Sequence, residues 1–249
     1  MTWNFLILSL LFLIPGMLVY AVRPDLRTAI HRMSVCALPF ALTERFFYPD
    51  YWEPRFLFDL ADHIGFGLED ILFVVGLAAF TTTAYPAFFR KTYETQHVET
   101  GRVRVFRAVK ILLLTFIGVG LVVALRIPMI YGSIVIMTIA FAGLCLIRHD
   151  LLVPGLLGGL VSLGIYTLLC WLFEWMLPGV FDLAWHTDQF LNLFIAGIPL
   201  EELLYGFTSG MIATVFYPFV FEIRYVSLKN DGNTHSDLNP KLYDATAES

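Results

Sequence analysis

The sequence predicts an all-α, polytopic integral membrane protein with about seven transmembrane helices, arranged as two parallel three-helix repeats joined by an extra helix. Composition, the spacing of apolar segments and an internal similarity predict this fold. Of the 249 residues, 58% are hydrophobic and 15% are charged, and the mean hydropathy is +0.72. Soluble domains average about 25% charged residues, so a soluble enzyme is excluded. The net charge of −5, without a basic block, excludes nucleic acid as a partner.

Seven segments are apolar enough to cross a bilayer, which takes about 20 residues. The last of them is longer than a bilayer needs, so we expect it to contain an interfacial turn. The seven segments are Trp3–Val22, Arg32–Tyr48, Gly65–Ala87, Val109–Leu125, Pro128–Ile147, Leu151–Leu177 and Phe190–Val220.

The Lys and Arg residues alternate between connections, as expected for a chain that crosses a membrane seven times. The connections after the first, third, fifth and seventh segments hold 13 of the 16 Lys and Arg residues, when Arg32 and Lys110 at the starts of the following segments are counted with them. Because cytoplasmic loops carry the excess of these residues, we expect a plasma-membrane protein with its N-terminus outside and its C-terminus in the cytoplasm. From about Ser227 the sequence turns polar, which predicts a disordered cytoplasmic tail.

Two segments of the sequence are similar, without gaps, at a fixed offset of 132 residues. Residues 65–86 read GFGLEDILFVVGLAAFTTTAYP, and residues 197–218 read GIPLEELLYGFTSGMIATVFYP. The polar matches carry the similarity, because each segment has an acidic pair near its start and Tyr-Pro at its end. Upstream, FDLADH (58–63) echoes FDLAWH (181–186). The similarity predicts a duplication.

An odd number of spans in each copy requires an extra helix between the copies if both are to lie parallel. The repeats would then be related by an axis near the membrane normal, as in some transporters, with a site where the halves meet. The expected units are a first repeat at 1–95, a connecting helix at 105–127, a second repeat at 128–222 and the tail at 227–249.

Two acidic pairs, Glu69-Asp70 and Glu201-Glu202, are expected inside apolar helices rather than at their tips. An ionised acid in the middle of a span costs about 2.5–3.5 kcal/mol, and adjacent acids repel each other. At least one carboxyl group in each pair is therefore expected to be protonated at pH 7. Pro199 cannot donate a helical hydrogen bond, so we expect a bend there. These four acids are the candidate catalytic residues.

The segment Pro-Leu-Glu-Glu-Leu-Leu-Tyr at 199–205 resembles the PxEExxF box of the heterodimeric lycopene β-cyclases and their fused relatives. Residues 38–60 (LPFALTERFFYPDYWEPRFLFDL) and 65–73 (GFGLEDILF) are similar to bacterial lycopene cyclase domain-containing proteins. The resemblance covers about residues 3–222. It implies a carotenoid end-group cyclase of the lycopene β-cyclase type, an intramolecular lyase or isomerase that acts without a redox change or cofactor. The acids of the motif are then its acid–base residues.

The first acidic segment departs from the second, because Gly67 stands in place of Pro199 and Asp70 in place of Glu202. We therefore expect the first segment to contribute less.

Proton-initiated cyclisation requires a protonated acid, a nearby carboxylate, aromatic walls and the exclusion of water. The candidate substrate-binding residues are Pro199, Tyr205, Phe73, Glu174 and Glu44.

Two other functions remain open: a lipid- or carotenoid-binding membrane protein without activity, and a proton-coupled transporter, since buried acids also relay protons. The expected partners are a linear carotenoid or other isoprenoid substrate and membrane lipid, and a homo-oligomer is left open.

No metal site is expected, because Asp59-x-x-Asp62 is a single Asp-rich motif and the histidines are scattered. The last span contains no lysine that could bind retinal.

Reporter fusions test the expected topology. A reporter fused at Ser227 is expected in the cytoplasm, and one in the Trp185–Asp188 loop is expected outside, because of the Lys and Arg asymmetry. Both reporters on one side of the membrane would contradict seven spans and the parallel arrangement of the repeats.

Overall fold

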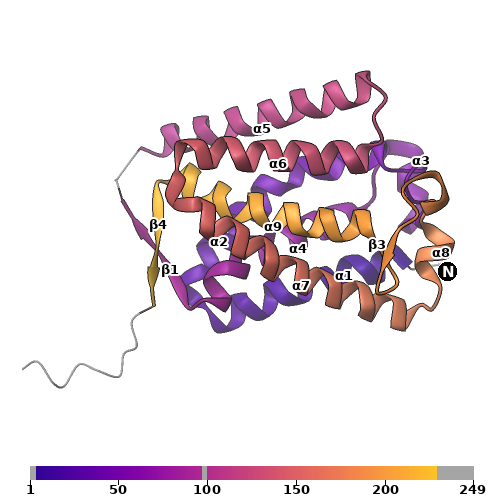
Figure 1. Ribbon diagram of the computed structural model, residues 1–249, viewed down its shortest axis with the longest axis horizontal. Helices are drawn as coiled ribbons and strands as arrows, with labels where there is room; N and C mark the ends of the chain where they lie inside the picture. Colours follow the sequence, from indigo (N-terminus) through magenta and orange to yellow (C-terminus); the bar gives the residue numbers. More distant parts are fainter. Residues whose placement is uncertain (1–3, 97–99, 229–249) are drawn as a thin grey trace, which may run out of the picture.

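The computed structural model of the chain describes residues 4–96 and 100–228 (Figure 1). Within these residues, six helices are long and apolar enough to cross a membrane. They lie along the long axis of the molecule (Figure 1), and the predicted all-α, polytopic membrane fold is confirmed. The six are α1 (Asn4–Val22), α4 (Leu68–Phe88), α5 (Gly101–Ala124), α6 (Met129–Ile147), α7 (Leu152–Met176) and α9 (Leu200–Phe221).

Shorter elements connect the long helices. The α-helices among them are α2 (Arg27–Ala37), α3 (Leu60–Ile64) and α8 (Val180–Ala184). The 3-10 helices are η1 (Pro24–Leu26), η2 (Leu38–Phe46), η3 (Leu57–Asp59), η4 (His149–Leu151) and η5 (Thr187–Gln189). The strands are β1 (Lys91–Thr95), β2 (Phe194–Ile195), β3 (Ile198–Pro199) and β4 (Ile223–Ser227). The turn expected in the last apolar segment is the β2–β3 hairpin, which precedes α9.

The second expected span is a composite of two elements rather than one long helix. The α-helix α2 ends at Ala37, and the chain continues as the tighter 3-10 helix η2. Pro39 gives the physical reason, because proline has no N–H to donate and its ring crowds the preceding helical turn.

Together α2 and η2 carry the chain from one end of the bundle to the other. At one end, Arg23 Nη2 donates to the carbonyl of Lys91 in β1 at 2.6 Å. At the other end, Trp52 forms an isolated β-bridge with Trp185, which follows α8. The described chain therefore runs the length of the bundle seven times, although the number and orientation of membrane crossings stay predictions. Of the tail expected at 227–249, residues 229–249 lie outside the described residues.

The strands β1 and β4 join the ends of α4 and α9 in an antiparallel pair (Figure 1). Arg90 and Glu222 precede these strands, and both have a left-handed backbone, with φ values of 51° and 50°. The amide of Leu228 donates to the carbonyl of Arg90, and the amide of Gln96 donates to the carbonyl of Glu222, each at 2.9 Å. Arg90 and Glu222 are 132 positions apart, and so are Gln96 and Leu228. The two acidic segments align at this same offset.

Tyr93 and Tyr225, also 132 positions apart, lie directly opposite each other in this sheet. The hydroxyl of Tyr93 donates to the carbonyl of Thr82 at 3.3 Å, and that of Tyr225 donates to the carbonyl of Thr214 at 2.8 Å. Burial raises the pKa of both hydroxyls, so both remain neutral donors. A local two-fold axis therefore passes between these tyrosines. The helices α4 and α9 lie beside each other and run in the same direction.

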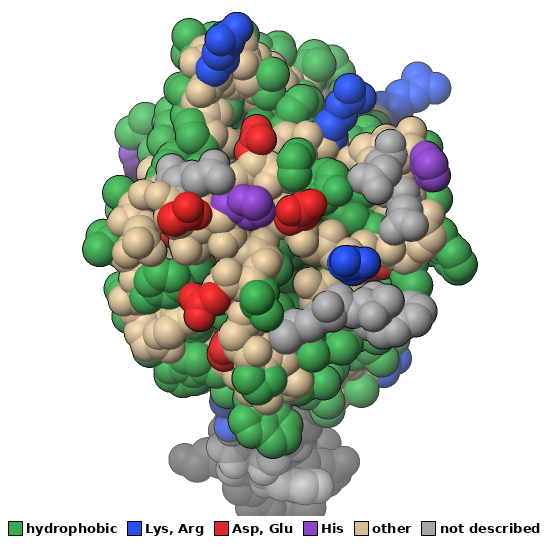
Figure 2. All heavy atoms as spheres, turned by 90° about the vertical axis from the view of Figure 1, so that its right-hand side faces the viewer, with side chains coloured by type: hydrophobic (Ala, Val, Ile, Leu, Met, Phe, Trp, Pro, Cys, Tyr) green, Lys and Arg blue, Asp and Glu red, His purple; other side chains and the backbone are tan. Residues whose placement is uncertain are grey.

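The two ends of the bundle differ in charge. Figure 2 shows acidic and histidine side chains at the centre of the end that contains α3 and α8, with a few Lys and Arg side chains towards its rim. At the opposite end, Arg107 and Arg148 form ion pairs with Glu222 at 3.0 and 3.8 Å, and Arg224 pairs with Glu94. Charged groups at both ends and apolar side chains between them are the distribution that a membrane protein requires.

Glycines allow α7 and α9 to pack closely, and both helices contribute walls to the functional site described below. A Cβ added at Gly158 would lie 2.1 Å from Oγ1 of Thr214, and one at Gly210 would lie 2.3 Å from Cβ of Ser162. Small residues at such contacts let the backbones of membrane helices approach each other. Gly164, also in α7, has no atom within 4 Å of such a Cβ.

We predict that Gly158→Ala destabilises the protein, because its methyl group overlaps Thr214. Overpacking of this kind costs about 1–3 kcal/mol. Gly164→Ala is the matched control, and it should be neutral or slightly stabilising, since alanine is the better helix former. Thermal unfolding in detergent measures both variants, and equal effects would show that α7 and α9 are not in close contact at Gly158.

Candidate functional site

Both acidic pairs lie in the first turn of a helix, so their expected position inside the helices is wrong. The helix α4 begins at Leu68 after Gly67, whose backbone is extended, and α9 begins at Leu200 after Pro199. The expected bend at Pro199 is absent for the same reason, because this proline caps α9 and belongs to β3. Gly65 and Gly197 turn the chain just before each helix, with φ values of 84° and 80°.

The acids are buried although they are close to helix ends. Glu69 is 0% exposed, Asp70 2%, Glu201 1% and Glu202 8%. The positive end of the helix dipole favours carboxylates in the first turn, and this position gives each acid access to the connection that precedes its helix. The four acids are therefore buried as expected, because the folded connections before α4 and α9 cover the starts of these helices.

The first acid of each pair holds the connection before its own helix. Glu69 Oε1 accepts a hydrogen bond from the amide of Leu57 at 2.6 Å. Glu201 Oε1 accepts from the amide of Leu191 at 3.1 Å and from the hydroxyl of Tyr131 at 2.9 Å. Neither glutamate lines the cavity described next, because adjacent helical positions point about 100° apart.

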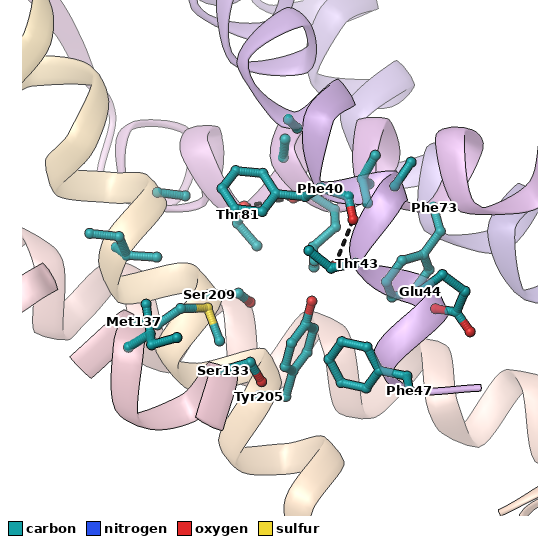
Figure 3. Close-up of a pocket in the computed structure, with 18 of the residues that line it drawn as sticks. Phe40, Thr43, Glu44, Phe47, Phe73, Thr81, Ser133, Met137, Tyr205 and Ser209 are labelled. Carbon is teal, nitrogen blue, oxygen red and sulfur yellow. Dashed lines mark hydrogen bonds between the residues drawn. The ribbon is translucent and has the colours of Figure 1, made fainter. Parts of the chain in front are cut away.

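The second acid of each pair lines a cavity of about 250 Å³. The cavity lies among α1, α2, η2, α4, α5, α6, α7 and α9, and its walls are mainly apolar. Figure 3 shows the Tyr205 hydroxyl directed into the cavity, the rings of Phe40, Phe47 and Phe73 around it, and Glu44 beside Phe73. The sequence-predicted residues Phe73, Tyr205 and Glu44 therefore share one space with Asp70 and Glu202.

The cavity is elongated, with its carboxyl groups near one end. Its lining runs along α9 from Glu202 to Phe216, about 21 Å at the helical rise of about 1.5 Å per residue. The part farthest from Glu202 is lined by apolar side chains such as Met33, Ile111 and Phe216. This shape suits a linear hydrocarbon whose terminal group reaches the carboxyl groups.

Glu202 is surrounded by hydrogen-bond donors from three other segments. Its Oε1 accepts from the hydroxyl of Tyr51 and from Nε1 of Trp185, each at 2.9 Å, and its Oε2 accepts from the hydroxyl of Tyr166. Tyr51 lies in a connection outside the expected spans, and burial followed by the charge of Glu202 raises its pKa. Tyr51 therefore stays a donor, and the three donors together stabilise a negative carboxylate.

Glu44 and Asp70 form a second carboxyl centre in the same cavity. Both side chains line this cavity, and they lie close enough for each carboxyl group to influence the other. Trp52 Nε1 donates to Glu44 Oε1 at 2.7 Å, and the amide of Gly67 donates to Asp70 Oδ2 at 2.6 Å. The rings of Trp52 and Trp185 are 4.9 Å apart, so the indole donors of the two centres pack against each other.

Two of the expected substrate-binding residues lie elsewhere. Pro199 precedes α9 and is outside the cavity lining. Glu174 lies near the end of α7, as Glu44 lies near the end of η2, but its Oε1 accepts from the amide of Gly179 at 2.6 Å, away from the lining. It therefore stabilises the turn between α7 and α8.

Sequence reasoning did not single out the aromatic donors of the site. Trp185 lies in the segment FDLAWH (181–186), which is similar to residues 58–63. Trp52 lies in residues 38–60, which resemble lycopene cyclase domain-containing proteins. Tyrosine and tryptophan beside apolar spans were the available signal, because a buried hydroxyl or indole N–H needs an acceptor. Which acid each donor reaches depends on the folding of the connections, and the sequence spacing does not give it.

Residues 128–220 match the family model described as Lycopene cyclase. This match is consistent with a lycopene cyclase domain-containing protein, and the matched residues are called the lycopene cyclase domain below. No curated protein and no solved structure matches the chain. The lycopene cyclase domain supplies Glu202, Tyr166 and Trp185 to the site, whereas Glu44 and Asp70 precede the matched residues. The cavity is thus shared between this domain and the first half of the chain.

We predict different effects for two substitutions of Glu201. Glu201→Ala removes the acceptor of the Tyr131 hydroxyl and one of the two acceptors of the Leu191 amide, and the loss of a hydrogen bond to a charged group costs about 1.5–3 kcal/mol. Glu201→Gln keeps a carbonyl acceptor and should remain close to wild type in thermal unfolding. A glutamine variant as unstable as the alanine variant would show that the charge of Glu201, rather than its acceptor oxygen, holds this connection.

Proposed function

We propose that this protein cyclises an end group of a linear carotenoid of the lycopene type, within the membrane and without a redox change. The observation that carries the proposal is the elongated apolar cavity in which Glu44, Asp70 and Glu202 gather near one end. The lycopene cyclase domain at 128–220 supports a carotenoid substrate and the assignment to an end-group cyclase.

The proposed reaction requires protonation and deprotonation of carbon in a site without bulk water. A carboxylic acid protonates the terminal alkene, an internal alkene closes the ring on the resulting cation, and a carboxylate removes a proton. The product is an isomer of the substrate, so no electrons are exchanged with a cofactor. We assign this chemistry to the carboxyl groups that line the cavity, and we assign Glu69 and Glu201 to the support of the connections.

Aromatic rings supply the remaining requirement. Phe40, Phe47, Phe73 and Tyr205 line the cavity (Figure 3), and the faces of aromatic rings attract cations. The faces of these rings stabilise the carbocation by electrostatic attraction. They also exclude water, which would convert the cation to an alcohol.

The two halves of the chain, in our proposal, are duplicated units that build this site together. The equivalent backbone turns and tyrosine contacts at an offset of 132 support the duplication. The excess of Lys and Arg in the connections at the end that carries β1 and β4 supports a plasma-membrane orientation with that end toward the cytoplasm. The N-terminus would then lie outside and the C-terminus in the cytoplasm.

Expression in a lycopene-accumulating bacterial host, followed by chromatography of the pigments, tests the proposed function. The wild-type protein should convert lycopene to ring-containing products. Glu202→Gln should reduce ring formation by about 10²–10⁴-fold, because glutamine cannot exchange a proton and a positioned acid or base contributes this much.

Glu201→Gln is the matched control on the neighbouring position, and it should keep most of the activity, since its oxygen can still accept the Leu191 amide. Full activity of Glu202→Gln would remove this glutamate from the mechanism. Unchanged lycopene in the presence of intact wild-type protein would contradict the proposal and favour a binding protein or a transporter.

A further inference from the structure

The carboxyl groups of Glu44 and Asp70 are neighbours in the lining of one cavity, and none of the described residues that line it is a lysine or an arginine. A carboxylate can only accept hydrogen bonds, whereas a carboxylic acid can donate one. Two neighbouring carboxyl groups without a cation beside them repel each other when both are ionised, so one of the two holds a proton. The other contacts are donors, Trp52 to Glu44 and the Gly67 amide to Asp70, so each oxygen that they reach acts as an acceptor.

Glu202 has the opposite environment, although it lines the same cavity. Three neutral donors, the hydroxyls of Tyr51 and Tyr166 and the indole of Trp185, occupy both of its oxygens. A proton on Glu202 would compete with one of these donors for an oxygen. Its contacts therefore favour a carboxylate, and titratable groups with contrasting environments divide the roles of acid and base.

We infer that the proton that starts cyclisation is held by the Glu44–Asp70 pair, and that Glu202 is the carboxylate that removes a proton at the end. This inference rests on the proposed cyclase function and assigns its two proton transfers. The first half of the chain then provides the acid, and the lycopene cyclase domain provides the base.

The transfers balance over one turnover. The pair gives its proton to the terminal alkene, where a new C–H bond forms and a tertiary carbocation remains. The internal alkene attacks this cation, which forms the ring C–C bond and moves the positive charge to a ring carbon. Glu202 takes a proton from the carbon beside that charge, and the C–H electrons form the new double bond. The proton gained by Glu202 must then return to Glu44 and Asp70 before the next turnover.

The structure offers a matched control for Glu44. Glu174 holds the corresponding late position in the second half, but its carboxyl group binds the amide of Gly179 outside the cavity lining. Both are glutamates that accept one close N–H donor. They differ in that Glu44 lines the cavity beside a second carboxyl group, that of Asp70, whereas Glu174 does not line it.

The test compares Glu44→Gln, Asp70→Asn and Glu174→Gln with the wild-type protein in the lycopene-accumulating host. Glu44→Gln and Asp70→Asn are each expected to lower ring formation by about 10²–10⁴-fold. The double variant should be no worse than either single variant, since residues that act as one unit are not additive. Glu174→Gln should cyclise lycopene at close to the wild-type rate. The amount of folded protein, measured by size-exclusion chromatography in detergent, normalises each value.

Deuterium incorporation separates the acid from the base. Membranes are incubated with lycopene in D₂O, and the recovered lycopene is analysed by mass spectrometry. Glu202→Gln keeps the proton donor, so reversible protonation should place deuterium in uncyclised lycopene. Glu44→Gln lacks the donor and should leave lycopene unlabelled. A merely structural role of Glu44 would not produce this difference between the two inactive variants.

The outcomes distinguish the inference from the function on which it rests. Unchanged lycopene with folded wild-type protein overturns the cyclase proposal itself. Active wild-type protein with active Glu44→Gln and Asp70→Asn variants overturns only the assignment of the acid. Deuterium in lycopene recovered from Glu44→Gln likewise overturns it. If Glu44→Gln does not fold, Asp70→Asn carries the same two tests.

Discussion

The hydrogen bonds of the Glu202 carboxyl group are the interaction on which the architecture of the site depends. They join α9 to the connection that contains Tyr51, to Tyr166 in α7 and to Trp185 after α8. A carboxyl group buried to 8% exposure is stable only where its oxygens have partners, because an unpaired buried charge costs several kcal/mol. The same bonds bring Trp185 against Trp52, which binds Glu44. The arrangement of one carboxylate therefore positions the second carboxyl centre.

Helix geometry divides the adjacent acids into two roles. With neighbouring side chains about 100° apart, one acid of each pair faces the preceding connection and the next faces the cavity. Glu69 and Glu201 accordingly bind backbone amides, while Asp70 and Glu202 line the cavity. The division recurs in both halves, so a structural acid fixes the connection beside each acid that faces the substrate space. Rigid support of this kind keeps reacting groups in place.

The sequence predicts the fold class because composition and apolar length follow directly from the physics of the bilayer. It also predicts the important segments, because polar residues in apolar spans are costly and therefore informative. It places Glu69, Asp70, Glu201 and Glu202 inside helices, since hydropathy does not show where helical hydrogen bonding begins. The start of α9 at Leu200 depends on the β2–β3 hairpin, whose strands are too short for a periodic signal.

The separation of Glu44 from Glu174 could not be predicted either. The two are loosely equivalent in sequence, but η2 turns Glu44 toward Asp70 while the end of α7 turns Glu174 toward Gly179. The cause is Pro39, which ends α2 and has no counterpart in α7 before Glu174 other than Pro154, in its first turn. Near-identical side chains thus acquire different partners through a local change in helix type.

The position of the acids at helix starts also bears on how a buried acid can protonate an alkene. Burial keeps the proton available, but it opposes the charge that proton transfer creates. Asp70 and Glu202 lie in the first turns of α4 and α9, where the positive ends of two parallel helix dipoles stabilise negative charge. The anion left by the Glu44–Asp70 pair is therefore formed where the fold already favours it. The cation forms on the substrate, between that anion, the Glu202 carboxylate and the aromatic rings of the cavity. Charge separation in an apolar cavity is offset by dipoles and donors that are fixed before the reaction begins. A helix that ran through the acids, as the hydropathy pattern suggests, would place them where backbone dipoles give no such net field.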